Sequence, residues 1–400
     1  MSFIHLVEPQ CTPGLWAILA LGFRPFFLLA ALFAATAAPT WILIYQGLLD
    51  PVSYLAPTVW HAHEMIFGFA IAVVAGFLLT AASNWTGRRT AAGPGLAALA
   101  ALWIAGRLAM VAGAGLPAWL VAGVDVAFLP ILAVVLARPI LAAGNRRNVI
   151  FPIVLLVLGA VNLSIHLGSL SAIAWDPSSG LRVAIDLILL MIGVLGGRVI
   201  PSFTKNALPQ ARVSPCPKAS MLALASLAAL AIADAASGTS GVTGALALLA
   251  GAMNALRMRG WGTLSTGRHP ILWILHVGYG WMAAGLLLRG VADLSGVIPM
   301  DASMHALTLG AIGCMILGMM SRVALGHTGR AISPARLTIV AYWLVNAAAL
   351  LRVLFAIIPD DMIRLAALSA SGCLWSLAFL CFFIVYLPIL SRPRADGRPG

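Results

Sequence analysis

The sequence predicts an all-α polytopic membrane protein with twelve transmembrane helices. Hydrophobic residues make up 62% of the 400 residues, charged residues only 9%, and the mean hydropathy is +1.01, which no soluble domain of this length approaches. Apolar runs of roughly 18 residues or more, long enough to span a bilayer, recur between short basic loops. Because the loops leave no room for a soluble catalytic domain, we expect any chemistry to lie within the membrane.

We expect a single membrane domain in which the spans follow one another along the whole chain. The predicted spans are 18–46, 60–83, 95–113, 118–137, 149–172, 182–200, 219–236, 242–257, 270–289, 303–322, 337–357 and 363–390. The first is long and contains Gly22-Phe23-Arg24-Pro25, which predicts an entry turn with a kink. Arg24 should reach the interface or find a partner, because a charge in lipid is costly.

The positions of the basic residues predict the topology. Cytoplasmic loops near helix ends carry an excess of Lys and Arg, and most of the 24 Lys and Arg here follow the even-numbered spans. Both termini are therefore predicted to be cytoplasmic. This pattern also explains the net charge of +12. No basic patch interleaved with aromatic residues is seen, so we predict no nucleic-acid binding.

Two histidines and a glutamate stand together at the start of the second span, in Trp60-His61-Ala62-His63-Glu64-Met65. Ionisable residues inside a membrane are functional candidates by default, and imidazole is a common ligand of metals and haem iron. His61 and His63 are two positions apart, about 200° around a helix, so their rings cannot converge on one ion. We expect them to serve two partners, with Glu64 available to orient a ring or move protons.

The predicted topology divides the other ionisable residues between two leaflets. The outer leaflet should contain a metal or redox site with candidate ligands His61, His63, His166 and His305, and with the carboxylates Glu64, Asp125 and Asp186; we assign Glu64 and Asp186 to proton transfer. The inner leaflet should contain a basic group that suits propionates, a quinone head or lipid phosphate: His276, His327, Arg198, Arg322 and Arg330. The competing interpretation is that these histidines are hydrogen-bonded structural residues and that the arginines only set topology.

An internal repeat predicts how the spans are organised. The second and tenth spans align without gaps, and the end of the sixth span matches the end of the tenth. Elements that recur at spans two, six and ten predict three units of four helices, roughly 1–140, 141–260 and 261–400. The aligned pairs include His63 with His305, Gly68 with Gly310, Gly76 with Gly318, and Arg198 with Arg322.

This plan resembles the catalytic subunit of haem-copper oxidases, where twelve helices form three arcs and histidines on the second and tenth helices hold haem. The likeness is architectural, and a fold does not settle a function. The sixth span departs from the pattern because it offers Asp186 and no histidine. Any copper would therefore need other ligands.

Longer motifs carry a more specific resemblance. They are GFRPFF at 22–27, WHAHEM at 60–65, NWTG at 84–87, GGRVIP at 196–201, HALT at 305–308 and GHTGR at 326–330. In this combination the chain resembles the NnrS family, described as haem- and copper-containing inner-membrane proteins of the bacterial nitric oxide response. The resemblance implies haem, of the b type, and copper as cofactors, the inner membrane as the location, and nitric oxide as the ligand.

Three functions stay open. The first is an enzyme that reduces nitric oxide with electrons from a donor such as a quinol. The second is a haem protein that binds nitric oxide, or protects a metal centre from it, without turnover. The third is a secondary transporter of protons or metal ions, which we rank last because the detected repeat is parallel and transporters more often show inverted halves.

Overall fold

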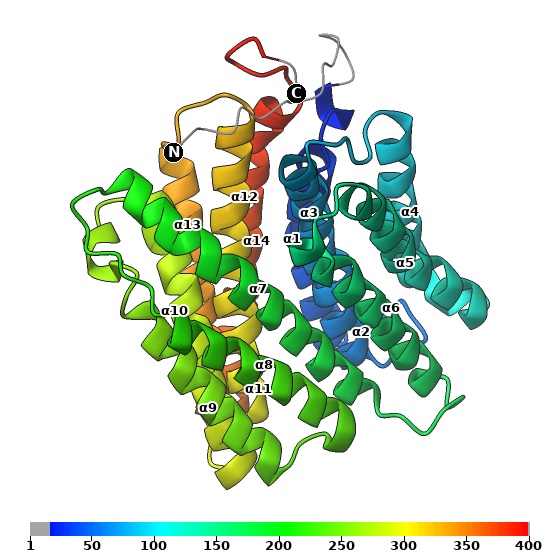
Figure 1. Ribbon diagram of the computed structural model, residues 1–400. Helices are drawn as coiled ribbons and strands as arrows, with labels where there is room; N and C mark the ends of the chain where they lie inside the picture. Colours follow the sequence, from blue (N-terminus) through cyan, green and yellow to red (C-terminus); the bar gives the residue numbers. More distant parts are fainter. Residues whose placement is uncertain (1–16, 399–400) are drawn as a thin grey trace. The chain divides into compact units, whose positions relative to one another are not determined.

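The computed structural model describes residues 17–398, and within them all regular structure is helical (Figure 1). Twelve helical segments are long and apolar enough to cross a membrane, which confirms the predicted fold and the number of spans. They are α1 (Phe23–Tyr45), α2 with η2 and α3 (Pro57–Thr86), α4 (Pro94–Val111), α5 (Ala118–Ala142), η4 with α6 (Arg146–Ser169), α7 (Pro177–Ala207), α8 (Pro217–Ser237), α9 (Gly241–Met258), α10 (Pro270–Ser295), α11 with η6 and α12 (Met300–His327), α13 with η7 (Arg336–Ile357) and α14 (Asp361–Leu390).

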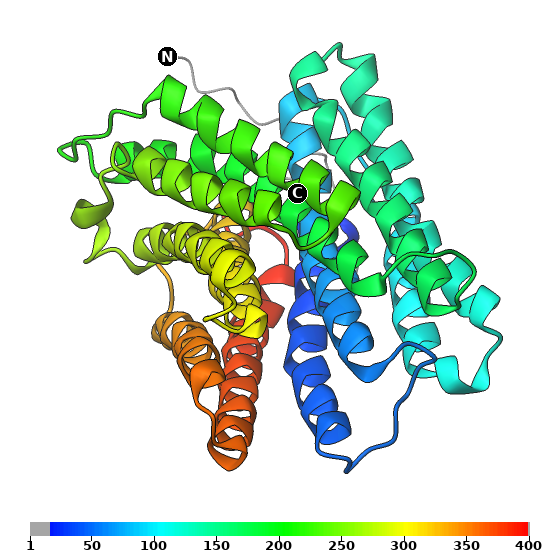
Figure 2. The same cartoon turned by 90° about the horizontal axis from the view of Figure 1, so that it is seen from below.

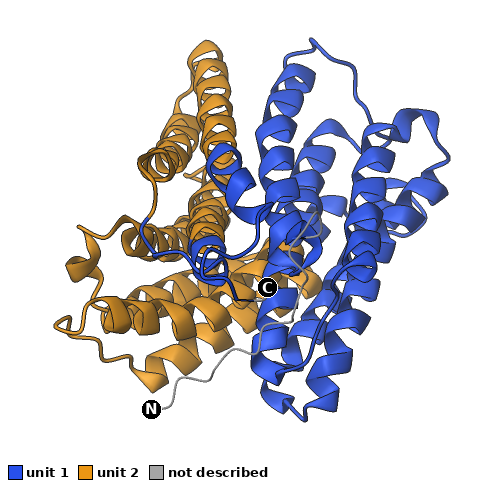
Figure 3. Cartoon of the chain, turned by 90° about the horizontal axis from the view of Figure 1, so that it is seen from above, with its two compact units in different colours: residues 1–181, 322–333, 382–400 blue, residues 182–321, 334–381 orange. Residues whose placement is uncertain are grey.

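The chain forms two compact units, which Figure 3 shows in different colours. Unit 1 comprises residues 1–181, 322–333 and 382–400, and unit 2 comprises residues 182–321 and 334–381. In unit 1, α5 packs against α3, α4 and α6. In unit 2, α9 packs against both α8 and α10, and α8 and α9 run side by side (Figure 2). The division into three repeats stays a prediction.

Two of the crossings contain a π-helical segment, and each segment directly follows a histidine. Segment η2 (Glu64–Ala70) begins after His63, and η6 (Ala306–Gly313) begins after His305. These histidines are equivalent in the internal repeat, so the same irregularity occurs at the same aligned positions. Since π segments often mark functional sites, this shared feature directs attention to the two histidines and supports the alignment of the two crossings.

Aligned glycines within both π segments allow close packing. A Cβ atom on Gly68 would lie 2.5 Å from Cε1 of Phe33, and one on Gly310 would lie 2.6 Å from Cδ2 of Trp281. Trp103 Nε1 also donates to the Gly68 carbonyl at 3.1 Å. An aromatic ring therefore lies against each glycine, and a larger residue would displace it.

Arg24 is fully buried in unit 1. Its Nη1 donates to the carbonyl oxygens of Leu390 at 2.9 Å and Arg392 at 2.8 Å. Carbonyl groups at the end of a helix have no partner within the helix, and they carry partial negative charge. Arg24 thus caps the end of α14, which confirms the prediction that it finds a partner. Pro25 lies in the first turn of α1, where a proline removes no helical hydrogen bond.

Candidate metal centre

A cluster of buried polar side chains lies inside unit 1 where η2 begins. None of these residues is more than 7% exposed. Because buried polar groups are costly without partners, such a cluster must be internally connected. Its members come from α2, η2, α4, α5 and α6, and they are His63, Glu64, Arg107, Asp125, Asn162 and His166.

The His63 ring contacts hydrogen-bond acceptors on both sides. Its Nδ1 lies 3.0 Å from Glu64 Oε1, and its Nε2 lies 2.7 Å from Asn162 Oδ1 and 3.3 Å from Asp125 Oδ2. The Asn162 amide is oriented by its own Nδ2, which donates to Asp125 Oδ2 at 2.7 Å. A neutral imidazole has only one N–H group. This ring therefore needs an additional positive charge, either a proton or a metal ion.

The His166 ring is held in a matching way. Its Nε2 lies 3.1 Å from Asp125 Oδ2, and its Nδ1 lies 2.5 Å from the Tyr54 hydroxyl. Tyr54 is in the connection between α1 and α2, where burial raises its pKa to about 12, so the phenol keeps its proton. Each imidazole is thus anchored at Nδ1 and directs Nε2 towards Asp125. Metal-binding histidines are typically anchored like this at their second nitrogen.

Arg107 links the two carboxylates of the cluster. Its guanidinium donates to Glu64 Oε1 and to Asp125 Oδ1. Two carboxylates and one guanidinium leave one negative charge in excess. A cation bound near Asp125 would balance that charge.

The donor set fits a transition-metal ion. The ligand atoms of His63, Asp125 and His166 all lie within 4.8 Å of one another. Two imidazoles and a carboxylate are ligands that suit copper, zinc or iron, and three protein ligands leave a coordination position for a further ligand. A small pocket beside the cluster is lined by Asp125 and Asn162 and by apolar side chains that include Phe67 and Phe128.

The remaining outer-leaflet candidates have other surroundings. The His61 ring stacks on Trp41, with ring centroids 4.7 Å apart and planes 14° apart, so His61 and His63 contact different groups, as their angular separation predicts. His305 belongs to unit 2, and its Nδ1 lies 2.8 Å from both the carbonyl and the carboxylate of Asp301. Asp186 also belongs to unit 2 and pairs with Arg289. The structure therefore gathers only part of the predicted site into this cluster.

The structure divides the predicted inner-leaflet group between the units. In unit 2, Nε2 and Nδ1 of the His276 ring lie 2.9 Å and 3.0 Å from the hydroxyls of Thr204 and Thr263, as in a structural histidine. In unit 1, the His327 ring packs on Phe23 at 5.6 Å. Arg198 is exposed, and Arg322 and Arg330 are partly buried.

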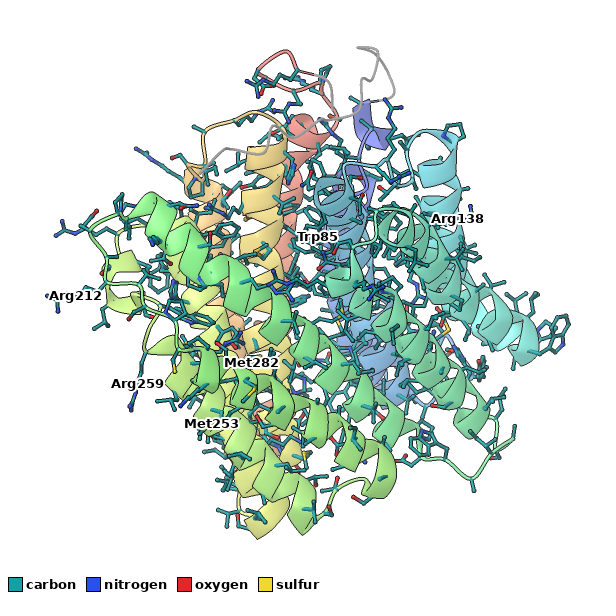
Figure 4. The ribbon with its side chains drawn as sticks, viewed as in Figure 1. Trp85, Arg138, Arg212, Met253, Arg259 and Met282 are labelled. Carbon is teal, nitrogen blue, oxygen red and sulfur yellow. The ribbon has the colours of Figure 1, made fainter. Side chains whose placement is uncertain are left out.

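Arginines in the loops of unit 2 extend outwards. Figure 4 shows Arg212 and Arg259 projecting away from the helices, and both are exposed. Side chains in such positions agree with a topological role for the basic loops.

Haem needs an axial imidazole nitrogen that is directed at its iron. His63 and His166 belong to the metal cluster, both ring nitrogens of His276 contact threonine hydroxyls, and His305 contacts Asp301 through Nδ1. His276 therefore does not fit as an axial ligand, whereas the anchor of His305 at Nδ1 leaves its Nε2 available. The haem prediction then depends on His61, His305 and His327.

Sequence reasoning missed Arg107, Asn162 and Tyr54. Arg107 had a usable signal, because it is the one charged residue of an apolar span and does not belong to a basic loop. Asn162 stands in an apolar helix in the same way. Tyr54 lies in a short loop and had no comparable signal.

The fold and this cluster define a class of protein: a polytopic helical membrane protein with a buried histidine–carboxylate group able to hold a metal ion. The chain belongs to the NnrS protein family, whose family model matches residues 17–394. That match covers nearly the whole chain and confirms the resemblance, and it is consistent with a membrane protein of the nitric oxide response. A search of curated proteins found no match.

Proposed function

We propose that this protein is a metalloprotein of the bacterial inner membrane, with both termini cytoplasmic, that binds nitric oxide and so relieves nitrosative stress. The metal would be held by His63, His166 and Asp125. The observation that carries this proposal is the His63 ring, whose two nitrogens both contact acceptors within a cluster that needs one more positive charge. A bound metal ion would meet both requirements.

Copper is the metal we propose. Sites with nitrogen and oxygen donors bind Cu(II) most tightly among the divalent first-row metals, and the family resemblance implies copper. Bound copper would supply a coordination position for nitric oxide. The protein contributes the anchors of the two imidazoles, the Arg107 guanidinium that orients Asp125, and the apolar wall of the pocket, including Phe67, Leu102 and Phe128. Nitric oxide is small and apolar, so it can reach such a pocket through the lipid.

Reduction of nitric oxide is a second candidate, and Glu64 favours it. Glu64 is fully buried, and among the described residues its Oε2 has no hydrogen-bond partner. Two nitric oxide molecules, two electrons and two protons give one nitrous oxide and one water. A quinol could supply the electrons, and Glu64 could transfer a proton beside the pocket. Asp186 belongs to a different cluster, so we do not include it in this site.

Metal analysis of the purified protein tests the proposal. We expect one copper per chain after loading with copper and removal of the excess, and a change in the copper spectrum when nitric oxide is added. His63→Ala and His166→Ala should lose the copper. His305→Ala is the matched control and should keep it, because His305 lies outside the cluster. Copper retained by both cluster variants would refute the proposed site.

Turnover separates binding from reduction. With a quinol analogue and excess nitric oxide, nitrous oxide formation would support the enzyme, and Glu64→Gln should slow it even when copper is supplied in saturating amounts. Binding without nitrous oxide would support the non-enzymatic role. Copper uptake into proteoliposomes would instead favour the transporter.

A further inference from the structure

Unit 2 contains a second buried charged cluster that the proposed metal centre does not use. Arg289 of α10 is fully buried. Its Nη1 donates to Asp186 Oδ1 of α7 at 2.9 Å, and its Nη2 donates to Asp234 Oδ2 of α8. Asp293, one turn further along α10, lies 3.6 Å from Arg289 Nε. Asp186 and Asp234 are 0% and 1% exposed, so water does not satisfy them.

The charges of this cluster do not balance. Its carboxylates are Asp186, Asp234 and Asp293, and its cations are Arg289 and Arg182, the latter interacting with Asp293. The neighbouring helix α9 contributes the hydroxyl of Thr243 and no charge. With every group ionised, one negative charge would be in excess in a buried position, which is strongly unfavourable.

Two carboxylate oxygens identify where a positive charge is needed. Among the described residues, Asp186 Oδ2 and Asp234 Oδ1 have no hydrogen-bond partner, although the two carboxyl groups interact directly with each other. Two buried acceptors placed together are stabilised when a proton lies between them, because like charges at short range cannot both ionise cheaply. In the described part of the chain only the His63 cluster offers three ligands in a metal-binding arrangement, so the cluster in unit 2 does not call for a metal ion.

We propose that Asp186 and Asp234 share one proton, held in place by Arg289, and form a proton-binding site within the membrane. The site lies towards one end of unit 2, since Asp186 is in the first half of α7 and both Asp234 and Arg289 are close to the ends of α8 and α10. Proton exchange at that end would allow the pair to take up or release a proton. This inference stands whether or not unit 1 binds a metal.

Asparagine substitution tests the shared proton, because an amide N–H can replace the O–H donor. Asp234→Asn should therefore unfold at the same temperature as the wild type, at neutral pH in detergent. If both carboxylates were ionised, the same change would remove an ion pair, and the unfolding temperature would fall. That fall would overturn the proposal.

Infrared spectroscopy provides a second readout that does not depend on a variant folding well. The wild type at pH 8 should show the C=O stretch of a protonated carboxylic acid, shifted in D₂O. The band should be lost in Asp186→Asn and Asp234→Asn and retained in the control Asp50→Asn, an exposed loop residue. Absence of the band from the wild type would overturn the proposal. So would stabilisation by NaCl but not by choline chloride, which would identify sodium as the ligand.

Discussion

Each unit contains a buried arginine that donates to two carboxylates, and the two clusters differ in the other groups around that arginine. In unit 1, Arg107 joins Glu64 and Asp125, and two imidazoles converge on the free side of Asp125. In unit 2, Arg289 joins Asp186 and Asp234, and the two carboxyl groups interact directly with each other. Both clusters need one more positive charge.

This difference indicates that the side chains around the arginine and its carboxylates determine which cation a buried cluster binds. Imidazole nitrogens anchored by Glu64 and Tyr54 are preorganised ligands for a metal ion. Bare carboxyl oxygens beside an arginine are better satisfied by a proton, as in other pairs of close carboxyl groups. The same charge arrangement can thus serve two chemistries within one membrane protein.

Removing either arginine should have the largest effect. Arg107→Gln and Arg289→Gln each leave buried negative charge without its counter-ion, and breaking a buried pair in this way costs about 3–5 kcal/mol. We expect both variants to be strongly destabilised in thermal unfolding followed in detergent. The lysine variants, which keep the charge, should lose less. If only one of the two glutamine variants were destabilised, the proposed similarity between the clusters would be contradicted.

Substitutions at the imidazole anchors should separate the two clusters. Glu64→Gln and Tyr54→Phe weaken the groups that orient His63 and His166, and changes of this kind typically lower metal affinity by about 10–100-fold. Asp186→Asn and Asp234→Asn should leave copper affinity unchanged. Competition with a chelator of known affinity measures all four. Equal losses in both units would contradict separate roles.

Substitutions of the aligned glycines test the repeat, and we expect them to destabilise the protein less than loss of either arginine. Gly68→Ala and Gly310→Ala should each destabilise the protein by about 1–3 kcal/mol, because the added methyl group overlaps a packed ring. Gly68→Ala should also weaken copper binding, since its Cβ would lie 3.3 Å from Arg107 Cδ. Gly310→Ala should not. Gly95→Ala is the control, with nothing within 4 Å of the added atom.

The smallest effect is expected at Asp396, outside both clusters. Arg394 donates to its carboxylate, with Nε to Oδ1 at 2.9 Å and Nη2 to Oδ2 at 2.5 Å, and lowers its pKa to about 2. A lowered pKa stabilises the folded state above the ordinary pKa of aspartate, and this contribution disappears as the pH falls towards 2. Asp396→Asn should remove that small pH dependence from unfolding curves and leave copper binding intact. A loss of copper would contradict the assignment of the site to His63, His166 and Asp125.

The fold could be predicted from sequence because each span carries its own signal in length and hydropathy. The clusters could be predicted only in part. His63, His166 and Asp125 were assigned to one leaflet from topology, but their convergence depends on the rotation and packing of several helices, which no local pattern encodes. His305 shows what the repeat does not predict. It aligns with His63 and also directly precedes a π segment, yet it contacts Asp301 of its own helix. His63 differs because it contacts residues of other helices, Asp125 and Asn162.

X-ray absorption at the copper edge of the loaded wild type tests the central claim most directly. The proposed site predicts two imidazole ligands and one carboxylate oxygen per copper, and a change in the spectrum when nitric oxide is added. His166→Ala should bind little or no copper under the same conditions. Sulfur ligands, a copper without imidazole, or an unchanged spectrum in His166→Ala would contradict the assignment of His63, His166 and Asp125 as the metal centre.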